Sequence, residues 1–155
     1  MVDLARILAP ERIVLDLKAS SKRQVLNDLA AYAADASGIE QAVVKTALHE
    51  REQLGSTGVG DGIALPHARL AGLDRLIGIF ARLQKPIPFE ALDDGPVDLV
   101  FLLLVPQDCA SEHLKTLARI ARTLRSDRLC SDLRRLNEPG TVWQILTGRA
   151  GEHAA

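Results

Sequence analysis

The chain has 155 residues, of which 47% are hydrophobic and 25% are charged, and its formal net charge is −1 at pH 7. This composition is typical of a soluble globular protein. The length predicts a single domain over residues 1–155 that buries its core without a metal or a disulfide. A near-neutral charge with one Trp and one Tyr argues against a nucleic-acid-binding surface.

The sequence also argues against export and membrane insertion. The first ten residues carry too little positive charge for a signal peptide. The longest strongly apolar run, Leu99 to Val105, is far shorter than the ~20 residues that a membrane-spanning helix needs. Cys109 and Cys130 belong to no CxxC or Cys/His metal spacing, which fits free thiols in a reducing compartment. We therefore expect a cytoplasmic protein.

The first third of the chain predicts a strand and two helices. Ile13–Leu17 alternates apolar and acidic residues like a short strand. Ser21 is the expected N-cap of a helix, with Gln24 reaching back to complete a capping box, and Gly38 is a natural stop. A second helix is expected from about Glu40 to Arg51, with its apolar side chains on one face.

The rest of the chain predicts further strands followed by helices. The glycine-rich run 55–62 breaks the helical pattern. After it we expect strands at 63–65, 76–83 and 97–105, and helices at 111–125, 127–136 and 141–146. Strands interleaved with helices indicate an α/β fold with a sheet covered by helices. Because no clear helix connects the strands near residues 76 and 97, part of the sheet is expected to be antiparallel.

One histidine follows the glycine-rich run directly. Residues 55–62 read GSTGVGDG, and Ile63–Pro66 connects them to His67. Glycines let backbone amides approach an anion closely, and short polar side chains such as Ser56 and Thr57 add donors. The proline fixes the backbone beside the imidazole. This arrangement suits a nucleophile that meets a phosphoryl group, and a buried histidine with both nitrogens hydrogen-bonded is the alternative.

His113 and Arg51 are the other candidates for an anion site. His113 is the second residue after Ser111, the expected N-cap, so it lies in a first helical turn, where the helix dipole favours an anion. The strand before it ends at Val105, at the carboxyl end of the sheet, where α/β folds bind ligands. Arg51 precedes the glycine run and can grip phosphate oxygens. The alternatives are a core histidine and an arginine that caps the last helix carbonyls.

The two remaining histidines are expected to be inert. His49 follows Lys45 by one helical turn on the polar side of its helix, which predicts a solvated surface histidine. His153 lies in the C-terminal sequence GEHAA, where a frayed tail is expected.

The spacing of the residues argues against other phosphate-binding motifs, a metal site and a hydrolase site. The glycine run lacks the Gly-Lys-Ser/Thr ending of a Walker loop, and it opens no long helix as a dinucleotide fingerprint does. Two histidines without a clustered cysteine or carboxylate fall short of a zinc site. No G-x-S-x-G elbow is present for a serine hydrolase.

The candidate residues fall in two segments that resemble known motifs. Residues 51–69, REQLGSTGVGDGIALPHAR, resemble the active-site signature of enzyme IIA domains of the fructose/mannitol type in the bacterial phosphotransferase system (PTS), and most of all the nitrogen-related branch, IIA-Ntr. Residues 111–118, SEHLKTLA, resemble the second-histidine motif of that family. The resemblance covers nearly the whole chain. It implies a mixed sheet flanked by helices, with the site near one sheet edge.

The resemblance also implies a role for each candidate residue. His67 would accept a phosphoryl group from the phosphohistidine of a small carrier, HPr or its paralogue NPr. His113 would orient that group without being phosphorylated, Arg51 would balance its charge, and Ser56 and Thr57 would line the pocket. No metal or cofactor is implied, and the chain would be a phosphoryl carrier rather than a free-standing enzyme.

Three functions stay open at this point. A IIA protein of the nitrogen-related branch regulates other proteins through its phosphorylation state, which we expect here. A transport IIA passes phosphate to a IIB partner and then to a sugar. A binding module would sense a small anion without transferring it. The surface that meets the carrier is expected to surround His67 and to be partly apolar, with Gly72 and Leu73 as candidates.

Overall fold

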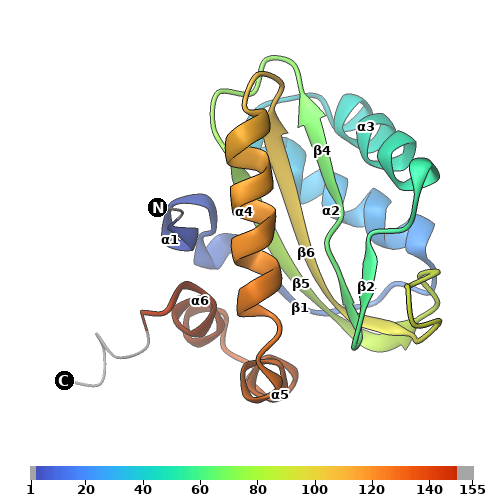
Figure 1. The fold of residues 1–155 in the computed structure, drawn as a ribbon, viewed down its shortest axis with the longest axis vertical. Coiled ribbons are helices and arrows are strands. Elements are labelled where there is room, and N and C mark those ends of the chain that lie inside the picture. The colour runs from blue at the N-terminus through green and yellow to red at the C-terminus, as the bar shows by residue number, and fades with distance from the viewer. Residues whose placement is uncertain (1–2, 150–155) are drawn as a thin grey trace.

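In the computed structural model, which describes residues 3–149, six strands form one mixed sheet (Figure 1). They are β1 (Ile13–Leu17), β2 (Gly58–Gly60), β3 (Ile63–Ala64), β4 (His67–Leu70), β5 (Ile77–Ile87) and β6 (Val97–Pro106). Their order is β1-β5-β6-β3-β2, and β4 also pairs with β6. Strands β5 and β6 run antiparallel, whereas β1 is parallel to β5, and β3 and β4 are parallel to β6. The expected mixed α/β fold is confirmed.

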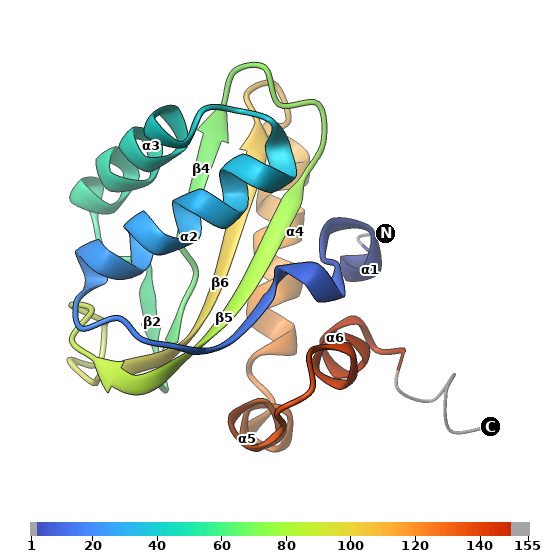
Figure 2. The same cartoon turned by 180° about the vertical axis from the view of Figure 1, so that it is seen from behind.

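Helices cover both faces of this sheet. Figure 2 shows α2 (Lys22–Ser37) and α3 (Gln41–Leu54) on one face. The other face carries α1 (Leu4–Ile7), a 3₁₀ turn (Pro10–Arg12), α4 (Ala110–Thr123), α5 (Asp127–Arg135) and α6 (Pro139–Thr147) (Figure 1). Within residues 3–149 no helix is both long and apolar enough to cross a membrane.

Strand β6 supplies the hydrophobic cores on both faces. Its side chains alternate, so that Val100 and Leu102 pack under α2 and α3, while Phe101 and Leu103 pack under the helices of the other face. All four residues are buried. A strand that is covered on both faces has no polar side, which explains why β6 is a continuous apolar run rather than an alternating pattern.

The caps of α2 agree with the sequence except in one detail. The hydroxyl of Ser21 accepts from the amide of Gln24 at 3.1 Å, and Gly38 ends the helix in the left-handed conformation, with a φ of 74°. The side chain of Gln24 does reach back, but its oxygen accepts from the amide and hydroxyl of Ser20 rather than from Ser21. The helix start is therefore predicted correctly, with the reciprocal bond shifted by one residue.

Three element boundaries near the two sequence motifs differ from expectation. Helix α3 continues past Arg51 to Leu54 and stops at Gly55. The glycine-rich run is not only a loop, because Gly58–Gly60 pairs with β3 as an antiparallel strand. A Cβ at Gly58 would lie 2.8 Å from Cβ of Ala91, so this close approach of two segments requires glycine. Helix α4 begins at Ala110 with Cys109, not Ser111, as its N-cap.

Candidate functional site

His67 is the first residue of β4 and is half-buried. The strand is held by its parallel pairing with β6, in which His67 lies opposite Leu103. The ring nitrogen Nδ1 lies 2.9 Å from the carbonyl oxygen of Leu65. Because a carbonyl only accepts, Nδ1 carries the proton in the neutral ring, and Nε2 carries the lone pair. The backbone before Pro66 therefore fixes both the orientation of the ring and its tautomer.

Arg51 faces this unprotonated nitrogen from the end of α3. Its Nε donates to Nε2 of His67 at 3.3 Å, and its Nη1 donates to the carbonyl oxygen of Gly55 at 3.0 Å. Arg51 thus points to the candidate nucleophile and also binds a carbonyl at the helix end, while its expected grip on phosphate oxygens stays a prediction. Its guanidinium links the histidine to the start of the glycine-rich run.

The second histidine, His113, lies beside the first. It is 7% exposed, and its ring centroid is 5.0 Å from that of His67 with an angle of 66° between the planes. The side chain of His113 therefore points into the protein. Its place in the helix differs from expectation, because α4 starts at Ala110 and Ser111 is not the N-cap. The amide of His113 already donates to the carbonyl oxygen of Cys109 at 2.9 Å, so it is not a free donor for an anion.

Arg69, which was not predicted from the sequence, completes the group. Its Nε donates to Nδ1 of His113 at 3.3 Å. Side chains alternate along a strand, so Arg69 projects on the same side of β4 as His67, while Ala68 between them is buried in the core. The sequence does place this arginine two positions after His67. Its side chain could not be assigned to the same side as the histidine, because no strand was expected after Pro66.

Burial and positive charge lower the pKa of both imidazoles and so favour their neutral forms. The pKa of His67 is lowered, chiefly because burial disfavours the charged ring, and the positive charges of Arg51 and Arg69 lower it further. The hydrogen bond to the Leu65 carbonyl acts in the opposite direction and raises this pKa. Burial also lowers the pKa of His113, with His67 and the two arginines adding to the effect. Two neutral rings are thus held between two guanidinium groups.

A cavity of about 560 Å³ opens against this group of side chains. It is lined by Ala47, Glu50, Arg51, Leu54, His67, Ala68, Arg69 and His113. Leu54, one of the residues that line this cavity, is apolar and 85% exposed. The site therefore combines a cationic, histidine-containing hollow with an apolar margin.

A family model described as "Phosphoenolpyruvate-dependent sugar phosphotransferase system, EIIA 2" matches residues 6–148. The chain belongs to this family. The nitrogen regulatory protein of Bradyrhizobium diazoefficiens is 46% identical over 140 residues, which cover 90% of this chain and 92% of that protein. The crystal structure of nitrogen regulatory protein IIA-Ntr from Neisseria meningitidis has a TM-score of 0.89 at 36% identity and covers 93% of this chain and 99% of that one.

A more distant match shows the fold alone. It is the mannitol IIA enzyme of Escherichia coli in its complex with phosphorylated IIB, which has a TM-score of 0.78 at 21% identity. This match covers 92% of the present chain and 98% of the mannitol chain. The resemblance of the two sequence motifs to IIA domains is thus confirmed at the level of family and fold.

Two residues expected in the phosphate pocket of this IIA domain lie elsewhere. The hydroxyl of Ser56 donates to the carbonyl oxygen of Phe89 at 2.7 Å. The hydroxyl of Thr57 donates to Oε1 of Glu52 at 2.6 Å, and its amide donates to Oε2 at 2.8 Å. Glu52 is buried and also pairs with Nζ of Lys22 at 2.8 Å. These hydroxyls hold the loop after α3 in place, so their expected role toward phosphate is corrected.

The expectations for the other surface residues are also revised. His49 is half-buried rather than solvated, and its Nε2 lies 2.8 Å from Oδ1 of Asn27 on α2. His153 lies outside the described residues. Gly72 is exposed in the turn after β4, but Leu73 is only 8% exposed and packs in the core, so its side chain does not form part of a partner surface.

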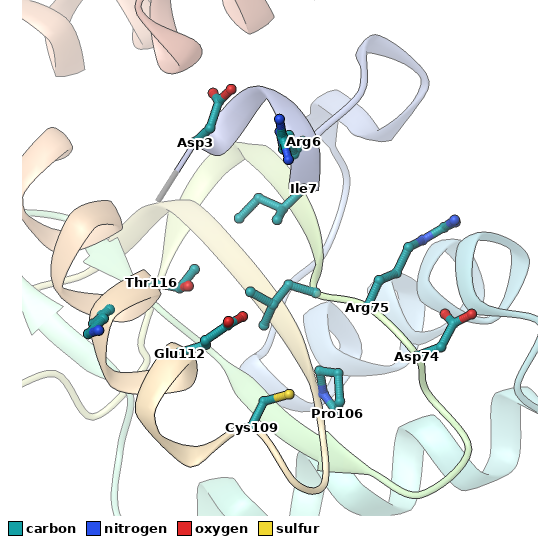
Figure 3. Close-up of a pocket in the computed structure, with 11 residues that line it drawn as sticks. Asp3, Arg6, Ile7, Asp74, Arg75, Pro106, Cys109, Glu112 and Thr116 are labelled. Atoms are coloured by element: carbon teal, nitrogen blue, oxygen red, sulfur yellow. The ribbon is translucent and has the colours of Figure 1, made fainter. Parts of the chain in front are cut away.

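A second cavity, of about 510 Å³, lies on the flank of α4 that faces α1 (Figure 3). Its lining includes Arg6 and Ile7 from α1 and Cys109, Glu112 and Thr116 from α4 and its N-cap. It contains none of the side chains that surround His67. Among residues 3–149 no group of three or more His, Cys, Asp or Glu side chains is arranged to hold a metal ion.

Proposed function

We propose that this IIA domain carries a phosphoryl group on Nε2 of His67 and acts as a regulatory member of the PTS. The observation that carries the proposal is the hydrogen-bonding of the ring. Nδ1 is occupied by the Leu65 carbonyl, while Nε2 presents its lone pair to a cationic cavity. A neutral imidazole is a good nucleophile and needs little further activation.

The chain's own residues account for each part of the transfer. The lone pair of Nε2 attacks the phosphorus of the donor's phosphohistidine. A new N–P bond forms as the donor's N–P bond breaks, and the electron pair of that bond stays on the donor nitrogen. The Nδ1–H of His67 shares the positive charge that develops on the ring with the Leu65 carbonyl. Positioning and charge stabilisation are the main tasks in phosphoryl transfer, and Arg51, Arg69 and His113 provide both.

Another protein of the PTS is the natural partner of such a site. We expect HPr or NPr as the donor, and a regulatory target as the molecule that senses the phosphorylated state. The regulatory role is supported by the relatives that are named nitrogen regulatory proteins, at 46% and 36% identity over most of their length. The alternative of a transport IIA rests on the mannitol IIA–IIB complex, whose IIA chain shares the fold at 21% identity.

The test is phosphorylation of the purified protein by phosphoenolpyruvate, enzyme I and either HPr or NPr. We expect acid-labile, base-stable label on the wild type, none on His67→Ala, and wild-type label on His49→Ala as a matched histidine control. A preference for NPr supports the regulator, and a preference for HPr supports the transport component. A folded wild type that takes no label from either active carrier would leave a binding module without transfer chemistry.

A further inference from the structure

We propose that Arg69 is a positioning residue, which holds the proton of His113 on Nε2 by donating a hydrogen bond to Nδ1. This inference rests on the proposed phosphoryl transfer and adds a fourth side chain to that site. The contact joins β4 to α4 across 44 positions of the sequence, so it relates the strand that carries the nucleophile to the helix that carries its neighbour.

The tautomer of His113 follows from the chemistry of its partner. A guanidinium group has donors and no acceptor, so the nitrogen that it contacts must offer a lone pair. Arg69 Nε lies 3.3 Å from Nδ1 of His113, which leaves the ring proton on Nε2. The neutral state of this buried ring agrees with its lowered pKa, whose main cause is desolvation. Arg69 thereby determines which of the two ring nitrogens can donate.

The donor that results has no acceptor among residues 3–149. Nε2 of His113 is buried and makes no hydrogen bond within the described part of the chain. A buried polar group without a partner is rare in native structures and calls for a specific explanation. The rings of His113 and His67 lie side by side in one cavity, and a phosphoryl group on His67 brings three strong acceptor oxygens to that place. The unpartnered donor is therefore matched to the phosphorylated state.

Arg69 could instead act only through its charge on the phosphoryl oxygens, and a double-mutant cycle separates the two roles. Arg69→Met keeps an unbranched side chain out to the position of Nε and removes the donors and the charge. If Arg69 acts through His113, the substitution loses most of its effect when His113→Ala is already present, because there is no ring left to position. If Arg69 acts on its own, the two effects multiply.

The first measurement is the single-turnover rate of transfer from the phosphorylated carrier. We expect Arg69→Met to slow transfer by about tenfold, equivalent to ~1.4 kcal/mol, in the wild-type background, and by less than about twofold in the His113→Ala background. Arg119→Met removes an exposed arginine from the same helix α4 and serves as the charge control, with a wild-type rate expected. Equal slowing in both backgrounds would overturn the proposal.

The second measurement does not depend on transfer. The ¹⁵N resonances of the His113 ring report which nitrogen is protonated, and we expect Nε2–H in the wild type and a mixture of both tautomers in Arg69→Met. An unchanged single tautomer in that variant contradicts the positioning role even if transfer is slow. Because Arg69 is exposed, we expect the variant to fold, and Arg69→Ala takes its place in both measurements should it not. Absence of label on the wild type would refute the relay, while the ring resonances would still decide the role of Arg69.

Discussion

The Nε–H of Arg51 donates to Nε2 of His67 across 3.3 Å, so the arginine occupies the lone pair that we propose as the nucleophile. Formation of an N–P bond consumes this lone pair, and the hydrogen bond between the two side chains cannot persist in the phosphorylated protein. The guanidinium then has phosphoryl oxygens beside it as new acceptors, and these are charged. Arg51 thus exchanges a neutral acceptor for an anionic one, which favours the phosphorylated state.

Loss of Arg51 is expected to weaken the phosphorylated state more than the fold. Hydrogen bonds to charged groups contribute about 1.5–3 kcal/mol, so Arg51→Ala should shift the phosphorylation equilibrium with the carrier by about 10- to 100-fold toward the carrier. The label should also be lost faster from His67. The equilibrium is measured by titrating phosphorylated carrier against each variant, with Arg119→Ala as the control for lost charge. An unchanged equilibrium would remove Arg51 from the proposed mechanism.

The lowered histidine pKa values predict how transfer depends on pH. Only the neutral ring of His67 is nucleophilic, and burial lowers the pKa at which that ring becomes protonated. The single-turnover rate should therefore be flat above pH ~6.5, the ordinary histidine pKa, and decline only at more acidic pH. A decline that is already half complete at pH 6.5 would show that the ring is not desolvated.

The same shifts predict a loss of stability in acid. The folded protein binds protons on His67, His113 and His49 at lower pH than the unfolded chain does, since burial lowers all three pKa values. Stability rises with pH wherever the unfolded chain binds more protons, so the free energy of unfolding is highest above pH ~6.5 and falls as pH decreases below it. Urea unfolding at several pH values measures this slope. His113→Gln should reduce the slope, because one of the three groups is removed.

The elements that could be predicted from the sequence are those whose pattern lies within one continuous segment. The apolar run of β6 and the Ser21 and Gly38 caps of α2 are local patterns, and each specifies its element without help from distant residues. Strand β4 has four residues after a proline, too few for alternation to be recognised. It exists because β6 offers its backbone for parallel pairing, which is a tertiary effect.

The site residues also fall into two groups, those that a local sequence pattern identifies and those whose role depends on tertiary packing. His67 and Arg51 lie in one continuous motif, and both were found from the sequence. The hydroxyl of Thr57 was assigned to phosphate because its partner, the buried carboxylate of Glu52, could not be recognised on a helix that was expected to end at Arg51. Arg69 was missed because its contact with His113 depends on how β4 and α4 pack together.

The hydrogen bonds of Thr57 predict an effect on stability without an effect on chemistry. Thr57→Val keeps the shape of the side chain and removes the hydroxyl that donates to Oε1 of Glu52. One oxygen of a buried carboxylate loses its partner, which costs about 1–3 kcal/mol of unfolding free energy. The rate of phosphorylation at a temperature where the protein is folded should stay at the wild-type value. If the rate fell while stability did not, Thr57 would belong to the phosphate pocket after all.

The exposed Leu54 at the cavity predicts where the carrier docks. Leu54 is 85% exposed, and burying one leucine fully is worth about 1.5–3 kcal/mol. Leu54→Ser should raise the KM for the phosphorylated carrier by about 3- to 10-fold if half of that burial occurs in the complex. The rate at saturating carrier should not change, since the leucine carries no group that takes part in the transfer. Leu92 is the matched control, because it is 81% exposed and lies by β2, away from the cavity at His67. An equal rise in KM for Leu92→Ser would mean that general surface hydrophobicity, rather than this margin, governs the encounter.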